Sequence, residues 1–406
     1  MSTSANNAWF NHARYGMFIH WGPYSVGGRG EWTANRELYS KYEYTLEFVE
    51  KFTAENFDPR AWARVAKEAG MGYMVLTTRH HDGFCLWDTD TTSFKSTKIG
   101  PMRDIVREFA EAAREAGLKV GFYFSMADWF HRDYPGAHRR DWPDNWLDEE
   151  ARQRFVAFYH AQLEELMTRY GQVDILWYDG CIPSPTDGTA INTRIKQLQP
   201  GILINNRNGD PHDFHSCEQA IKPAPAGHDW EACMTLNENW GFHAGDNNWK
   251  NARAVLKLLT ETASNAGNLL LNVGPRADGT IPQPSIDILR EAGDWLRRNP
   301  GWLHGSDRSP YSWNMWGRST VNGNKIYLHI FNGVGASLRV GDIGNRILSA
   351  KYLDGGAPVP FKQTKDLTIF TGVPTPLKDP IATTIVLEVE GKPETTRTQT
   401  SFWIPE

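Results

Sequence analysis

One pattern of hydrophobic and polar positions recurs along the first 300 residues: an amphipathic helical stretch, a glycine, and then a short apolar run. It occurs at residues 59–78, 103–125, 152–180, 195–206 and 255–275. In the second copy, Ile105, Phe109 and Ala113 share one face of a helix with 3.6 residues per turn. The apolar runs are continuous, which is typical of strands buried on both faces of a parallel sheet. The pattern therefore predicts alternating helices and parallel strands.

The ends of these helices carry recognisable boundary signals. Asp58 followed by Pro59 indicates an N-cap with proline at the first helical position. Helix stops are predicted at four glycines, each close to the apolar run that follows: Gly70, Gly117, Gly171 and Gly267.

The number of strands helps to decide between two α/β architectures. Apolar runs at residues 16–22 and 230–236 bring the total to at least seven. Closure at eight gives a (β/α)8 barrel of the TIM type, whereas an open doubly wound sheet is the competing fold. The dinucleotide-binding pattern G-x-G-x-x-G does not follow the first strand, and polar residues gather at many strand ends. Both features favour the barrel.

The pattern changes in the last quarter of the chain. From about residue 309 to residue 391 the apolar runs are short and alternating, and Gly, Asn and Pro separate them. This predicts a small C-terminal antiparallel β-sandwich. The expected domains are the barrel over residues 1–305, the sandwich over residues 306–392 and a tail over residues 393–406.

Charge and hydropathy exclude some partners. The 406 residues carry a net charge of −5 without a block of Lys and Arg, so neither nucleic acid nor a membrane surface is an expected partner. No apolar run approaches the roughly 18 residues of a membrane span. Residues 1–10 have neither the cationic nor the apolar part of a signal peptide, which favours a cytoplasmic location.

Cysteines and aromatic residues narrow the chemistry further. The four cysteines are scattered without C-x-x-C spacing, which fits neither a zinc site nor a disulfide framework: Cys85, Cys181, Cys217 and Cys233. The chain also holds 17 Trp, 14 Tyr and 19 Phe. So many aromatic residues suit a core, and they also suit a pocket that stacks on the C–H faces of a sugar.

The residues at the strand ends are the candidates for function, because barrel chemistry sits at the C-terminal ends of the strands. They are His20, His80, His81, Asp82, Tyr123, Trp177, Asp179, Asn206 and Arg207. The set contains no serine nucleophile elbow and no phosphate-binding loop. Its mixture of imidazole, hydroxyl, indole, guanidinium and carboxylate suits a pyranose, which has several hydroxyls and one reacting carbon.

These candidates also have structural interpretations. A single histidine at a strand end, such as His20, is structural about as often as it is functional. His80 and His81 point to opposite sides of a strand, so both reach the barrel interior only if the chain turns there, as the following Asp-Gly pair suggests. A metal site at this tandem is disfavoured because no second cluster has ligand spacing. Asp179 could instead cap a helix or form a turn.

Six segments carry a further signal because they follow one another in a known order. They are R-Y-G-M-F-I-H-W-G-P-Y-S-V (14–26), E-W (31–32), T-R-H-H-D-G-F-C-L-W (78–87), D-I-L-W-Y-D-G (174–180), W-E-A-C-M-T-L-N-E-N-W-G-F (230–242) and N-L-L-L-N-V-G-P (268–275). With them the chain resembles the α-L-fucosidases of glycoside hydrolase family 29 over essentially its whole length. The resemblance implies a (β/α) barrel followed by a β-sandwich. It also implies a retaining enzyme that hydrolyses terminal α-L-fucose from fucosylated oligosaccharides or glycoconjugates through a covalent intermediate.

The resemblance assigns roles to single residues. Asp179 is implied as the nucleophile, with Arg207 beside it to hold it ionised. Trp240 is implied as an aromatic wall against the C6 methyl of fucose. The implied lining of the fucose pocket is His20, Glu31, Trp32, His80, His81, Tyr123, Trp177 and Arg207. No cofactor and no metal is expected, the expected partner is the fucosylated oligosaccharide, and the oligomeric state is left open.

The proton donor has two candidates. Family members place it in a T-P-E-like segment downstream of the nucleophile, where this chain has D-F-H-S-C-E-Q (213–219), with Ser-Cys in place of Thr-Pro. Glu218, in what is interpreted as a polar loop, is preferred on spacing. Glu231, at the start of an expected strand, is the alternative, and it could also be a pocket or supporting carboxylate paired with a His or Arg.

Two other classes of function are weighed against the fucosidase. One is a non-catalytic sugar-binding barrel, against which the presence of Asp179 and two candidate acids argues. The other is a metal-dependent hydrolase that uses His80 and His81, which activity surviving EDTA would exclude.

Overall fold

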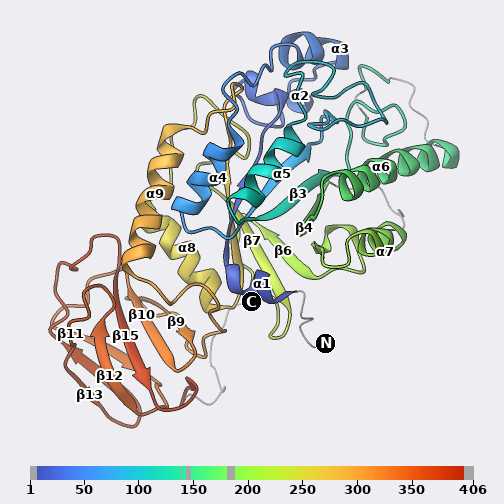
Figure 1. Cartoon of the computed structure of the whole chain (residues 1–406). Coiled ribbons are helices and arrows are strands. Elements are labelled where there is room, and N and C mark those ends of the chain that lie inside the picture. The colour runs from blue at the N-terminus through green and yellow to red at the C-terminus, as the bar shows by residue number, and fades with distance from the viewer. Residues whose placement is uncertain (1–6, 138, 143–147, 181–187, 397–406) are drawn as a thin grey trace. The chain divides into compact units, whose positions relative to one another are not determined.

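The computed structural model describes residues 7–137, 139–142, 148–180 and 188–396 of the chain (Figure 1). The chain divides into two compact units. The first holds Met1–Ala8, Tyr15–Lys250 and Leu270–Arg290, and the second holds Trp9–Arg14, Asn251–Leu269 and Glu291–Glu406. The domain boundaries predicted at residues 305 and 392 stay a prediction. Among the described helices, none combines the length and hydrophobicity that a membrane span requires.

A sheet of eight parallel strands forms the centre of the first unit. In chain order the strands are β1 (Tyr15–Ile19), β2 (Tyr73–Arg79), β3 (Lys119–Ser125), β4 (Ile175–Asp179), β5 (Leu203–Ile204), β6 (Phe214–Glu218), β7 (Asp229–Thr235) and β8 (Asn268–Val273). Their order in the sheet is β5-β4-β3-β2-β1-β8-β7-β6. A parallel bridge between Asn205, directly after β5, and Phe214 of β6 brings the two edges of the sheet together, so that the sheet is a nearly closed barrel. The predicted (β/α) barrel is confirmed.

Most barrel strands form where the sequence is continuously apolar. Every residue of β2 and of β8 is buried, as expected for parallel strands that are covered on both faces. Parallel pairing aligns the C-terminal ends of neighbouring strands, so that Ser125 of β3 lies opposite Asp179 of β4. The side chains at these ends therefore gather at one mouth of the barrel.

Strand β6 corrects the sequence interpretation, which placed residues 213–219 in a loop. Only Phe214 of this strand is buried, so the run lacks the continuous apolar pattern by which the other strands were predicted. β6 pairs in parallel with β7, and this pairing sets Ser216 opposite Glu231 and Glu218 opposite Cys233. Strand pairing, rather than hydrophobicity, fixes the position of Glu218.

In the first unit, helices connect successive barrel strands and lie on the outside of the sheet (Figure 1). The helices described in the whole chain are α1 (Ala8–Ala13), α2 (Thr33–Arg36), α3 (Lys41–Tyr44), α4 (Pro59–Glu68), α5 (Ile105–Glu115), α6 (Glu149–Arg169), α7 (Gly188–Leu198), α8 (Ala252–Ser264) and α9 (Gln283–Arg298). Shorter helical turns are η2 (Pro23–Val26), η3 (Thr45–Val49) and η4 (Asn206–Asn208). In the first unit, α4 packs against α5 and β2, α5 also packs against β2 and β3, and α6 packs against α7.

The helix ends follow the predicted signals with one exception. Asp58 caps α4, since its carboxylate accepts hydrogen bonds from the backbone N–H groups of Arg60 at 2.9 Å and Ala61 at 3.1 Å. The glycines after α4, α5 and α6 adopt the left-handed conformation as predicted: Gly70, Gly117 and Gly171. After α8 the left-handed residue is Ala266, with φ 57°. The predicted stop at Gly267 is wrong by one position, because α8 already ends at Ser264.

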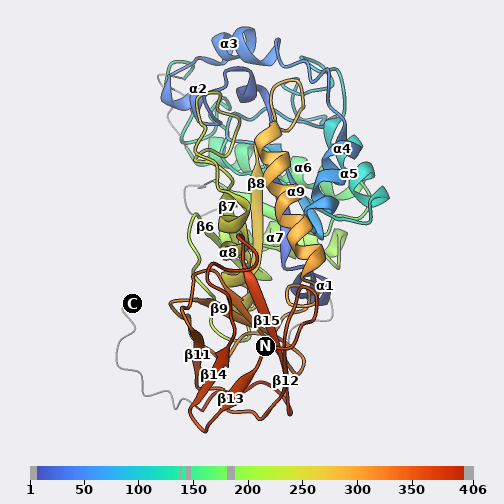
Figure 2. The same ribbon diagram turned by 90° about the vertical axis from the view of Figure 1, so that its left-hand side faces the viewer.

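Two antiparallel sheets in the second unit confirm the predicted sandwich. Their strands are β9 (Gly317–Asn322), β10 (Lys325–Ile330), β11 (Ser337–Gly341), β12 (Ile347–Tyr352), β13 (Phe361–Gln363), β14 (Leu367–Thr371) and β15 (Thr383–Val389). One sheet has the order β12-β15-β10-β9. The other has the order β11-β14-β13, and its three strands are labelled in Figure 2. Leu328 and Ile385 from the first sheet share a core with Leu338 and Phe370 from the second. Residues 397–406 of the predicted tail lie outside the described residues.

Candidate active site

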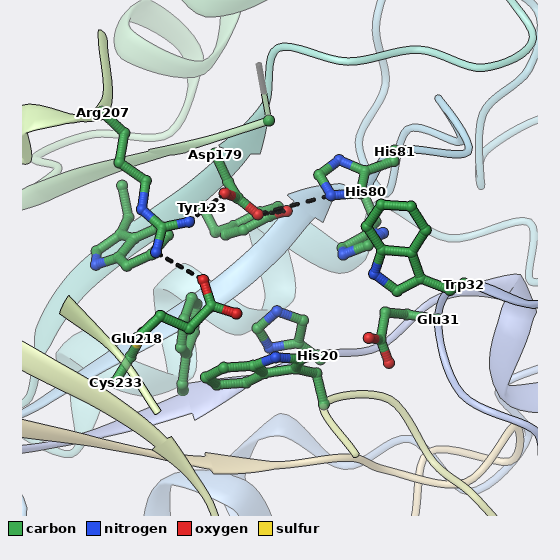
Figure 3. Close-up of a pocket in the computed structure, with 14 residues that line it drawn as sticks. His20, Glu31, Trp32, His80, His81, Tyr123, Asp179, Arg207, Glu218 and Cys233 are labelled. Atoms are coloured by element: carbon green, nitrogen blue, oxygen red, sulfur yellow. Dashed lines mark hydrogen bonds and ion pairs between the residues drawn. The ribbon is translucent and has the colours of Figure 1, made fainter. Parts of the chain in front are cut away.

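The C-terminal ends of the barrel strands surround a cavity of about 360 Å³ (Figure 3). This volume is in the range of pockets that bind small molecules. The cavity is lined by Phe18, His20, Glu31, Trp32, His80, His81, Tyr123, Trp177, Asp179, Gly180, Arg207, Glu218, Cys233 and Trp240. Of the candidates named from the sequence, Asp82, Asn206 and Glu231 are absent from this lining, and all the others belong to it.

Three lining residues were missed by the sequence analysis, although simple signals point to each. Phe18 precedes His20 by two positions and therefore faces the same side of the chain leaving β1. Gly180 directly follows Asp179. Cys233 lies on β7, in register with Glu218 of β6. Of the four cysteines in the sequence, Cys181 lies outside the described residues.

The tandem histidines both reach the cavity because the chain turns as soon as β2 has ended. β2 ends at Arg79, and the backbone N–H of Gly83 donates to the carbonyl of His80 at 3.0 Å. The rings of His80 and His81 lie close together, with centroids 4.2 Å apart and planes tilted by 46°. The condition stated from the sequence, a turn at the Asp-Gly pair, is therefore met.

Asp179 at the end of β4 is held by side chains from three other segments of the barrel. The Tyr123 hydroxyl donates to Oδ2 at 2.7 Å, and the Arg207 guanidinium donates to Oδ1. Nε2 of His81 lies 3.7 Å from Oδ2, and Nδ1 of the same ring is 2.6 Å from the Ser125 hydroxyl. The carboxylate is thus fixed in position while one edge stays open to the cavity (Figure 3).

These neighbours keep Asp179 ionised. Burial alone would raise the pKa of Asp179, but His81, Arg207 and the hydrogen bond from Tyr123 outweigh it and lower the pKa. Burial lowers the pKa of His81 itself, so this imidazole is neutral near pH 7. Arg207 is therefore the cation that holds the Asp179 charge.

Arg207 also holds a second carboxylate. One terminal nitrogen of its guanidinium contacts Asp179, and the other donates to Oε2 of Glu218 at 2.8 Å. The guanidinium carbon lies 4.6 Å from the centroid of the Trp177 ring, and this cation–π contact also stabilises the position of Arg207. One planar group thus sets Asp179 and Glu218 side by side at the mouth of the barrel (Figure 3).

The opposite side of the cavity carries a third carboxyl group. Glu31 lies in the loop before α2 and is buried, and its Oε2 accepts a hydrogen bond from the backbone N–H of Gly241 at 2.8 Å. Burial raises the pKa of Glu31, and the charges of Glu218 and Asp179 raise it further, while the hydrogen bond from Gly241 lowers it. Next to it, Trp32 is 40% exposed and forms the rim of the cavity.

Glu231, the alternative proton donor, does not line the cavity. It is fully buried, and it accepts hydrogen bonds from the Trp177 indole at 2.9 Å and from the Tyr73 hydroxyl rather than from a His or Arg. Glu231 precedes Cys233 by two positions on β7, so it faces the same side of the strand but lies deeper in the barrel. It supports the pocket floor and does not line the pocket.

The polar side chains are not arranged as a metal site. Asp82, which follows the tandem histidines, accepts a hydrogen bond from the Tyr44 hydroxyl at 2.7 Å and does not line the cavity. Within residues 7–137, 139–142, 148–180 and 188–396, no group of three or more His, Cys, Asp or Glu side chains is placed to hold a metal ion.

Comparison with known proteins identifies the family. Residues 1–301 match the family model described as alpha-L-fucosidase. The chain is 32% identical to the plasma alpha-L-fucosidase of Homo sapiens over 329 residues, which cover 72% of this chain and 68% of that protein.

Solved structures show the same similarity. Alpha-L-fucosidase isoenzyme 1 from Paenibacillus thiaminolyticus has a TM-score of 0.90 at 39% identity, covering 96% of this chain and 100% of that one. A GH29 alpha-L-fucosidase from Bacteroides thetaiotaomicron has a TM-score of 0.84 at 28% identity, covering 95% and 96%. The strand-end residues, the barrel and these similarities agree: the chain belongs to the α-L-fucosidase family of glycoside hydrolases.

Proposed function

We propose that this enzyme releases terminal α-L-fucose from fucosylated oligosaccharides or glycoconjugates with retention of configuration, through a covalent intermediate on Asp179. The observation that supports this most strongly is the Arg207 guanidinium, which binds Asp179 and Glu218 at the same time. Retaining glycosidases hold their two carboxyl groups about 5–5.5 Å apart, whereas inverting enzymes leave about 6.5–9.5 Å for a water molecule. A single guanidinium that bridges both carboxylates favours the shorter spacing.

In the first step, Asp179 attacks the anomeric carbon as the bond to the leaving oxygen breaks, and Glu218 gives its proton to that oxygen. The products are the released alcohol and a fucosyl ester on Asp179. In the second step, Glu218 takes a proton from water, whose oxygen attacks the same carbon and frees Asp179. Two inversions give net retention, and Glu218 regains its proton.

The environments of the two carboxyl groups suit these roles. Asp179 has a lowered pKa and is ionised, as a nucleophile must be. The side chain of Glu218 is 43% exposed, which places it where a leaving group extends from the cavity towards solvent. The aromatic walls from Phe18, Trp177 and Trp240 suit the C6 methyl of fucose and the C–H faces of its ring.

A related structure supports the covalent step. The Bacteroides thetaiotaomicron structure similar to this chain is described as a trapped covalent intermediate in complex with 2-fluoro-fucosyl fluoride. The shared fold and the site geometry are most simply interpreted as forming the same class of intermediate on Asp179.

The test is Asp179→Gly with an aryl α-L-fucoside. Loss of the nucleophile should lower kcat by at least about 10³-fold without unfolding the protein, and azide should restore turnover in part and give β-fucosyl azide. The matched control is Asp174→Asn, at the other end of β4, where the carboxylate pairs with Lys119 at 2.9 Å. This control should keep its activity.

Two results would contradict the proposal. An Asp179→Gly variant that keeps a tenth of the wild-type kcat would remove Asp179 from the nucleophile role. Proton NMR of the first sugar released by the wild-type enzyme should show α-fucose, and early β-fucose would instead identify an inverting enzyme.

A further inference from the structure

Asn272 on β8 links two residues of the cavity wall without lining the cavity itself. Its side chain is buried. Its Oδ1 lies 2.7 Å from Nδ1 of His20, and its Nδ2 donates to the backbone carbonyl of Trp240 at 2.7 Å. One amide therefore touches both the histidine at the end of β1 and the loop that follows β7.

Elementary chemistry fixes the direction of both hydrogen bonds that the Asn272 side chain makes. A backbone carbonyl only accepts, so the group that faces Trp240 must be the NH2 of Asn272. The amide oxygen then faces His20, and because an amide oxygen also only accepts, Nδ1 of His20 must carry the hydrogen.

The opposite ring nitrogen of His20 is therefore a bare acceptor. Burial lowers the pKa of His20 to about 3, although Asn272 and Asp179 raise it and His81 and Arg207 lower it further. The ring is neutral near pH 7 and holds one proton, which Asn272 places on Nδ1. Since Nδ1 is turned towards β8 and the ring lines the cavity between Glu31 and Glu218 (Figure 3), Nε2 is the nitrogen that is left for the cavity.

We propose that Asn272 is a positioning residue that holds His20 in its Nδ1–H tautomer, so that Nε2 accepts a hydrogen bond from one sugar hydroxyl. The proposal rests on the proposed function, in which a fucosyl group occupies the cavity. A buried acceptor of this kind selects for substrates that carry the matching hydroxyl, because an analogue that lacks it leaves Nε2 unpaired. The hydrogen bond from Asn272 to the Trp240 carbonyl also connects this amide to the loop after β7, whose Trp240 side chain lines the cavity.

The tautomer can be measured directly on the substrate-free protein. In long-range ¹H–¹⁵N NMR spectra of ¹⁵N-histidine-labelled enzyme, the two neutral tautomers have distinct ¹⁵N shift patterns, and a His20→Gln sample assigns the resonances. We expect His20 to show a protonated Nδ1 and a bare Nε2. An Nε2–H tautomer, or an even mixture of the two, would overturn the proposal whether or not the enzyme is active.

Activity gives a second measurement. Asn272→Asp keeps the shape of the side chain, but its carboxylate cannot donate to the Trp240 carbonyl as the amide does. It also puts a negative charge beside Nδ1, which raises the pKa of His20 and turns Nε2 into a donor below the new pKa. The variant leaves the other titratable and charged groups around His20 unchanged: Glu31, His80, His81, Asp179, Arg207 and Glu218. We expect kcat/KM for an aryl α-L-fucoside to fall about 10- to 100-fold at acidic pH and to recover as pH rises. A loss that is equal at every pH would indicate a structural role only.

Asn268→Asp is the matched control. Asn268 is a second buried asparagine on β8, but its Nδ2 donates to the backbone carbonyl of Phe10, away from the cavity. This variant introduces the same charge on the same strand, and the shape of its pH profile should match that of the wild type. If Asn268→Asp shifts the acidic limb of kcat/KM as Asn272→Asp does, any negative charge on β8 produces the shift, and the proposal fails.

Monodeoxy fucosides identify the hydroxyl. If one hydroxyl donates to Nε2, the analogue that lacks this hydroxyl does not make that bond in either enzyme. Asn272→Asp should therefore lower kcat/KM for this analogue only by the amount that the shifted pH profile of the variant accounts for. The analogues that lack other hydroxyls should keep the full loss. An equal loss on every analogue would disconnect Asn272 from hydroxyl recognition. Failure of the proposed function would look different, since the wild type would then hydrolyse none of these fucosides.

Discussion

Replacing Glu231 by Gln tests whether the barrel holds an ionisable group beneath the pocket. The carboxyl group is fully buried on β7 and accepts hydrogen bonds from the Trp177 indole at 2.9 Å and from the Tyr73 hydroxyl. Burial raises its pKa from 4.5 to about 7, against the lowering effect of these two hydrogen bonds. Gln keeps the shape and can pair with both neighbours, but it cannot ionise.

The sign and size of the effect follow from this pKa. The folded protein binds the Glu231 proton more tightly than the unfolded chain, so its free energy of unfolding falls as pH rises from 4.5 to 7. At 1.36 kcal/mol per pKa unit, ionisation of Glu231 costs the folded state about 3 kcal/mol above this window. Below pH 4.5 the carboxyl is protonated in both states, and the contribution disappears.

The assay is urea unfolding of the wild type and Glu231→Gln across this pH range. Both proteins share every other titrating group, so the difference between their free energies of unfolding isolates Glu231. The free energy of unfolding of the variant minus that of the wild type should increase by about 3 kcal/mol from acidic to mildly alkaline pH. Parallel pH dependences in the two proteins would refute the reasoning, because Glu231 would then not change its charge on folding.

Two further predictions concern the catalytic carboxyls. Glu218→Ala should lose far less activity on an aryl fucoside with a good leaving group than on a natural disaccharide, and azide should speed it up and give α-fucosyl azide. Glu31→Gln is the comparison variant, because burial also raises the pKa of Glu31. If Glu31→Gln shows this dependence on the leaving group and Glu218→Ala does not, the proton donor is Glu31. Arg207→Met removes the cation beside Asp179, so the pKa of Asp179 rises and the acidic limb of kcat/KM moves to higher pH. An unmoved limb would show that Arg207 does not control the nucleophile.

The sequence by itself determined the strands that are buried on both faces. β2 and β8 are continuously apolar and wholly buried, and a run of this kind between helices has few alternatives to a parallel strand. The rule that barrel chemistry sits at strand ends then picked out His20 and Asp179 as candidates. The family resemblance added Glu31 and Trp32, which lie in a loop that no periodicity marks, and both line the cavity.

Only the tertiary structure decided the role of the polar strand β6 and the depth of Glu231. The polar run that contains Glu218 becomes a strand because β7 pairs with it and because a bridge joins its Phe214 to Asn205 at the opposite edge of the sheet. A period of two tells which face of a strand a residue occupies, and on that criterion Glu231 and Cys233 are equivalent.

The level of a residue within the barrel depends on the register between neighbouring strands, which segments far apart in the sequence set together. Glu218 and Cys233 share one level and meet the cavity, whereas Glu231 lies one level deeper, against Tyr73 and Trp177. The same holds for hydrogen-bond direction: the amide of Asn272 fixes the His20 tautomer only through contacts that folding brings together. Local pattern determined which segments form the barrel, and pairing between distant segments determined which side chains meet in its mouth.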